Sequence, residues 1–106
     1  MNAPRPTAAE LQALSQACSS LWLATLSLMT AFMHQPAPAH RYLLARRIAR
    51  NFGTLREQPE AFDRATLEQF ARLEERWTTK AERLSPQRAE APGVFARLQR
   101  LLTSRG

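Results

Sequence analysis

Apolar residues recur at helical spacing along most of the chain, first in a long segment near its start. Here apolar or small residues alternate three and four positions apart, which is a heptad pattern. Its members are Leu11, Leu14, Cys18, Leu21, Thr25, Leu28 and Phe32. Thr7 and Glu10 fit a capping box before this pattern, and Pro36 and Pro38 follow it. The pattern predicts a helix from Thr7 to about Met33.

A second segment has its apolar stripe at Leu44, Ile48, Phe52 and Leu55. Pro38 is favourable in a first helical turn, so this helix is expected from Pro38 to somewhere between Phe52 and Gln58. Gly53 either is tolerated within the helix or marks a bend. Pro59 interrupts the pattern, because the residue before a proline is disfavoured in helical geometry.

A third segment is expected to be a helix capped by Asp63 and ended by Ser85 and Pro86. Its apolar face consists of Leu67, Phe70, Leu73, Trp77, Ala81 and Leu84. Residues 85–93 have the composition of a polar linker, and residues 1–6 that of a flexible lead-in. After the linker, Val94, Leu98 and Leu101 predict a short C-terminal helix that must dock to persist.

Composition supports an all-α fold. The chain has 106 residues, which is the size of a single domain, and only three glycines and one tyrosine. Alanine, leucine, arginine, glutamate and glutamine are abundant and favour helices. We therefore expect one helical domain over residues 1–106, an antiparallel hairpin or bundle of three long helices with a short C-terminal helix.

The first helix is apolar over too wide an arc to serve only one core. On a helical wheel its apolar residues cover about 220°, whereas one buried face needs little more than ~100°. No charged residue occurs from Leu11 to Met33. A two-fold symmetric dimer that pairs this helix is the predicted solution, and a buried helix in a monomer or binding to another protein are the alternatives. The expected association face is Leu14, Leu21, Trp22, Leu28, Met29 and Phe32.

Charge is concentrated in the second helix. The chain has 15 Lys and Arg against 9 Asp and Glu, a net charge of +6, and residues 41–56 contain five arginines and no acid. Arg46, Arg47 and Arg50 are expected on its solvent side, where they are either simply solvated or bind phosphates or an acidic partner. Residues 45–53 resemble the first half of a helix-turn-helix, but Pro59 falls where the recognition helix should continue.

No set of residues indicates catalysis, so we expect a non-enzymatic protein without a metal or cofactor. His34 and His40 have no Cys, Asp or Glu at ligand spacing, and a single cysteine excludes the common structural zinc sites. The three glycines are isolated, so no phosphate-binding glycine loop is present. The predicted activity is self-association or partner binding, and association with nucleic acid through the arginines is the alternative.

The only cysteine, Cys18, excludes an intramolecular disulfide and favours a cytoplasmic location. A secretory signal is an alternative, because Arg5, the apolar run of residues 21–33 and Ala37-Pro38-Ala39 have its general layout. Against it, Glu10 and a capped helix precede the apolar run. A membrane span or a lipid-surface helix is disfavoured by the interrupting serines and threonines and by the absence of basic residues within the helix.

Overall fold

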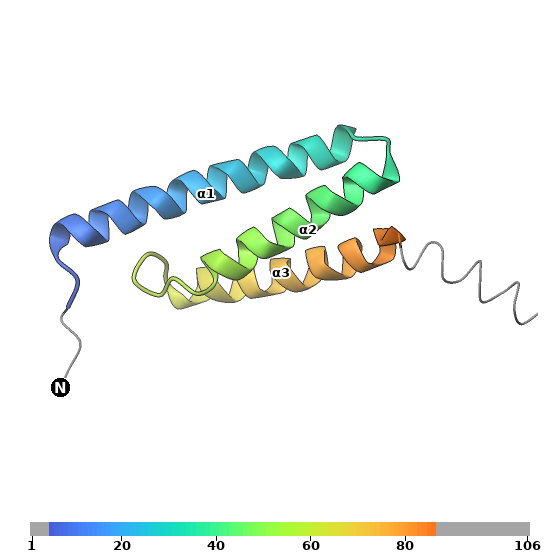
Figure 1. The fold of residues 1–106 in the computed structure, drawn as a ribbon. Helices are drawn as coiled ribbons and strands as arrows, with labels where there is room; N and C mark the ends of the chain where they lie inside the picture. The colour runs from blue at the N-terminus through green and yellow to red at the C-terminus, as the bar shows by residue number, and fades with distance from the viewer. Residues whose placement is uncertain (1–4, 87–106) are drawn as a thin grey trace, which may run out of the picture.

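The computed structural model describes residues 5–86 and contains three helices and no strand over that range. The helices are α1 (Ala8–His34), α2 (Pro38–Leu55) and α3 (Arg64–Leu84). Figure 1 shows α2 running back along α1 after a tight connection, with α3 along α2. The all-α prediction is confirmed; the predicted C-terminal helix lies outside the described residues.

Local sequence determines the ends of these helices. The Thr7 hydroxyl accepts a hydrogen bond from the Glu10 N–H at 3.1 Å, and the Glu10 carboxylate accepts one from the Thr7 N–H, so the predicted capping box is present. Pro38 is the first residue of α2. Asp63 caps α3, and hydrogen bonds from the side chain and backbone N–H of Thr66 hold the pKa of that carboxyl below its usual value.

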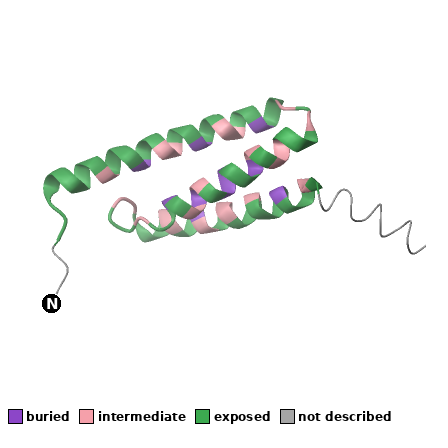
Figure 2. Ribbon diagram, in the orientation of Figure 1, coloured by how far each residue is buried: buried purple, intermediate pink, exposed green. Residues whose placement is uncertain are grey.

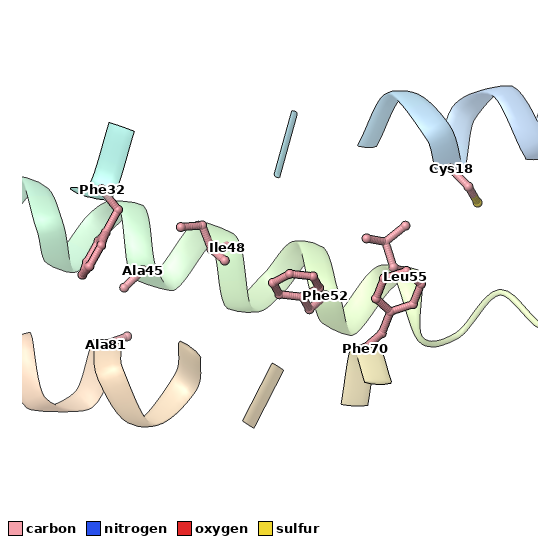
Figure 3. Close-up of a cluster of buried hydrophobic side chains, with 8 residues drawn as sticks. All are labelled: Cys18, Phe32, Ala45, Ile48, Phe52, Leu55, Phe70 and Ala81. Atoms are coloured by element: carbon pink, nitrogen blue, oxygen red, sulfur yellow. The ribbon is translucent and has the colours of Figure 1, made fainter. Parts of the chain in front are cut away.

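The core is centred on α2, whose Ala45, Ile48, Phe52 and Leu55 have no exposed surface. Figure 3 shows these side chains between residues of α1 and α3. Backbone packing of α2 is more extensive against α3 than against α1. The Trp22 ring of α1 contacts Phe52 of α2 and Phe70 of α3, with ring centroids 5.7 Å and 5.6 Å away. All three helices therefore meet at one aromatic cluster.

A buried polar contact joins α1 to α2. Thr25 has 0% exposed surface, and its hydroxyl donates to the Leu21 carbonyl at 2.7 Å. The same hydroxyl accepts a hydrogen bond from the Asn51 side-chain amide at 3.1 Å. Because a buried hydroxyl without partners is costly, this pair favours one register of the two helices.

Gly53 lies within α2, so the structure resolves the choice between a tolerated glycine and a bend in favour of the former. A β-carbon at this position would overlap the Glu74 carboxylate of α3. That carboxylate forms a 2.8 Å ion pair with Arg56. Glycine therefore leaves room for the Glu74 carboxylate beside α2.

We expect Thr25→Val to lower the free energy of unfolding by about 1 kcal/mol, because it removes the hydroxyl that pairs with Asn51 while preserving the shape of the side chain. Thr30→Val is the matched control, since the Thr30 hydroxyl also bonds a carbonyl four residues earlier but is exposed. Urea denaturation measures the free energy of unfolding of both variants. An equal loss of stability in the two would contradict the idea that Thr25 sets the register of α1 and α2.

Gly53→Ala is expected to change stability by less than about 0.5 kcal/mol in the natural chain. The gain in helix propensity, about 1 kcal/mol, is offset by displacement of Glu74 from Arg56. In a Glu74→Ala background the same substitution should stabilise by about 1 kcal/mol, because the overlapping carboxylate is gone. Urea denaturation of the four proteins checks this, and equal gains in both backgrounds would refute the packing explanation.

Candidate interaction surfaces

Most of α1 is uncovered by the rest of the described chain. Of its 27 residues only Cys18, Thr25 and Phe32 are buried, each seven positions from the next. They form a single line that faces α2, and Figure 2 shows the outer side of α1 exposed along its length. The first turns of α1 extend past the end of α2 in Figure 1. One face of α1 is thus used within residues 5–86, and the others are not covered by that part of the chain.

The six residues predicted as an association face lie on the inward side of α1. Phe32 is buried, with the Trp77 ring edge-on at 5.0 Å and the Arg41 guanidinium over its face at 4.4 Å. The other five are partly buried and pack against the core: Leu14, Leu21, Trp22, Leu28 and Met29. Helices α2 and α3 therefore occupy much of the surface that the sequence assigned to a partner.

Other apolar residues of α1 are the exposed ones. Leu23 is 64% exposed and Met33 is 79% exposed, and Leu11 and Leu26 are also exposed. The helical wheel places Leu23 among polar residues but Leu11, Leu26 and Met33 within the apolar arc, and nothing local indicates which part of that wide arc the neighbouring helices cover. That choice depends on the tertiary packing of Trp22 and Phe32.

A second heptad stripe runs along one flank of α1, with leucine and alanine alternating. We call it the Leu/Ala seam; it consists of Leu14, Ala17, Leu21, Ala24, Leu28 and Ala31. The three leucines are partly buried against the core, whereas the three alanines are exposed. At one end the seam forms the wall of a groove completed by Thr54 of α2 and by Gln58 in the connection that follows α2. The groove walls carry no charged side chain.

The three predicted arginines lie together on the outer side of α2. Arg46, Arg47 and Arg50 are exposed and, with Leu43, line one surface hollow. The Arg46 guanidinium bonds the Tyr42 hydroxyl at 3.4 Å. Among residues 5–86 the ion pairs are formed by other arginines, Arg56 with Glu74 and Arg64 with Glu68. The acids of α3 therefore form no ion pair with this cluster in the part of the chain that is described.

Titratable groups within the described residues offer little for chemistry. No cluster of three or more His, Cys, Asp or Glu side chains that would hold a metal occurs in that range. Burial raises the pKa of the Cys18 thiol, which keeps it protonated and poorly nucleophilic at neutral pH.

By length and composition, α1 meets the minimum for a helix that crosses a membrane, and 17% of its most apolar window is buried in the structure. Serine, threonine and glutamine occupy much of its exposed arc, at Gln12, Gln16, Ser19, Ser20, Ser27 and Thr30.

Comparisons of the chain with protein-family models, with curated proteins and with solved structures found no match.

Proposed function

We propose that this protein acts by association through α1, and that its partner is another protein surface, most simply a second copy of itself. The observation that carries the proposal is the exposure of an uncharged helix. Between Leu11 and Met33 no side chain is charged, yet only three residues of α1 are buried. Its exposed large apolar side chains, Leu11, Leu23, Leu26 and Met33, together with the absence of charge, support an interaction site.

A protein partner fits this helix better than a lipid surface. Helices that lie on membranes carry basic residues beside their apolar face, and α1 has none between Leu11 and Met33. The polar residues on its exposed arc are hydroxyl and amide side chains, which are easily accommodated at the rim of a protein interface. The partly buried leucines also lie next to exposed alanines, a surface that another helix can approach closely.

Light scattering behind size-exclusion chromatography tests self-association. The expected result is a mass twice the 12.0 kDa of the chain, unchanged between low and high salt, because the contact is apolar. Adding neutral or anionic vesicles before the same chromatography tests whether α1 binds a lipid surface instead. A monomer at all concentrations would refute self-association, and co-elution with vesicles would refute a protein partner.

The arginine cluster supports a second candidate function, the binding of phosphate groups on nucleic acid. Arg46, Arg47 and Arg50 converge on one hollow without forming ion pairs to the described acids. Such a cluster can neutralise backbone phosphates without reading base sequence.

If three phosphates are contacted, affinity for duplex DNA should fall roughly 40-fold between about 50 mM and about 200 mM salt. Replacing Arg46, Arg47 and Arg50 with glutamine should remove this salt dependence. The control replaces three exposed arginines of α3 (Arg64, Arg72 and Arg76) with glutamine, which alters net charge equally. Fluorescence anisotropy with labelled DNA and RNA measures the affinity of both triple variants. An equal loss of affinity in the two, or no binding by the natural chain at low salt, would contradict a phosphate site at this cluster.

A further inference from the structure

The alternation of leucine and alanine in the Leu/Ala seam is self-complementary when two copies of α1 run in opposite directions. In an antiparallel helix pair, each a position faces a d position of the partner. With a two-fold axis between Trp22 and Leu23, Leu14 faces the partner's Ala31, Ala17 faces the partner's Leu28, and Leu21 faces the partner's Ala24. Every leucine then meets an alanine, so large side chains fill the space that small ones leave.

We propose that the Leu/Ala seam is the interface of an antiparallel homodimer with its two-fold axis at this point. The inference rests on the self-association proposed above and specifies its surface, direction and register. A closed two-fold pairing uses the same patch on both copies, which a self-complementary seam provides. The exposed alanines permit the close approach that such packing needs.

The distribution of charge favours the Leu/Ala seam over other surfaces as the dimer interface. Each copy carries a net charge of +6, so the repulsion between two copies is smallest where the surface in contact carries no charge. The longest stretch of the sequence without Lys, Arg, Asp or Glu is residues 11–40, which contains the seam, and the groove beside the seam is uncharged as well. The outer side of α2, with its arginine cluster, would bring like charges together.

The seam is long enough to pair two copies of α1 over about five helical turns. From Leu14 to Ala31 it rises about 26 Å, and at the Leu14 end it continues into the groove beside Thr54 and Gln58.

Disulfide cross-linking of single-cysteine variants distinguishes the antiparallel pairing proposed here from a parallel pairing of α1. In a Cys18→Ala background, Ala17→Cys, Ala24→Cys and Ala31→Cys are prepared separately in the full chain and mildly oxidised. In the antiparallel register the two residues at 24 are offset by only about 4.5 Å along the helix axis, within reach of a disulfide. Those at 17 are about 16 Å apart along the axis and those at 31 about 25 Å, which is too far.

The expected result is efficient cross-linking of Ala24→Cys alone. Ser19→Cys is the matched control, because Ser19 is exposed on the opposite side of α1 and gives the background from random collision. Cross-linking at all three seam positions would overturn the proposal in favour of a parallel pair. A dimeric mass with only background cross-linking at every position would show that the chain self-associates but that the Leu/Ala seam is not the interface. A monomeric mass would refute both, and the seam would then be free or covered by residues 87–106.

A charge variant gives a second test without oxidation. Ala24→Arg places a cation at the centre of the seam and should convert the dimer to monomer, whereas Ser19→Arg should leave the mass unchanged. Both positions are exposed, so both variants should retain the helical circular dichroism of the natural chain. Loss of the dimer in both, or in neither, would overturn the assignment of the interface to the seam.

Discussion

The contact of Trp22 with Phe52 and Phe70 is what makes three helices into one structure. Helices α1 and α3 have little backbone contact with each other, and both pack on α2. Phe52 has no exposed surface, and burying a side chain of this size contributes about 2–3 kcal/mol. Trp22 reaches past α2 to the Phe70 ring and so ties α1 to α3. The position of α1 therefore depends on α2 and on two aromatic pairs with α3, Trp22 with Phe70 and Phe32 with Trp77.

This central position of α2 explains why α1 is only partly covered. A helix whose apolar arc is twice as wide as one core requires needs neighbours on two sides. Here α3 packs mainly on α2, so α1 receives only one line of buried residues, Cys18, Thr25 and Phe32. Because Thr25 also pairs with Asn51, rotation of α1 to bury a different face would break this hydrogen bond between the two helices. The surplus apolar surface is a direct result of this packing.

The sequence predicted the helices well because their ends are set by local chemistry. Thr7, Pro38 and Asp63 act within a turn of their own positions, and the structure places a helix start at each. The interaction surface could not be predicted in the same way. A wheel places Phe32, Leu26 and Met33 in the same apolar arc but does not say which of them faces α2, and only the packing shows that Phe32 lies inside and the other two outside. The alternating seam was readable in the sequence, but its exposure was not.

The two candidate surfaces lie on different helices and need not compete. The arginine cluster is on the outer side of α2, whereas the Leu/Ala seam is on a flank of α1. A two-fold axis at α1 would duplicate the arginine cluster, giving six arginines instead of three in one assembly. Since each phosphate contact contributes separately to the salt dependence of binding, two clusters that engage one nucleic acid would steepen that dependence. Self-association would then strengthen phosphate binding without any new contact, because the second cluster acts at high effective concentration.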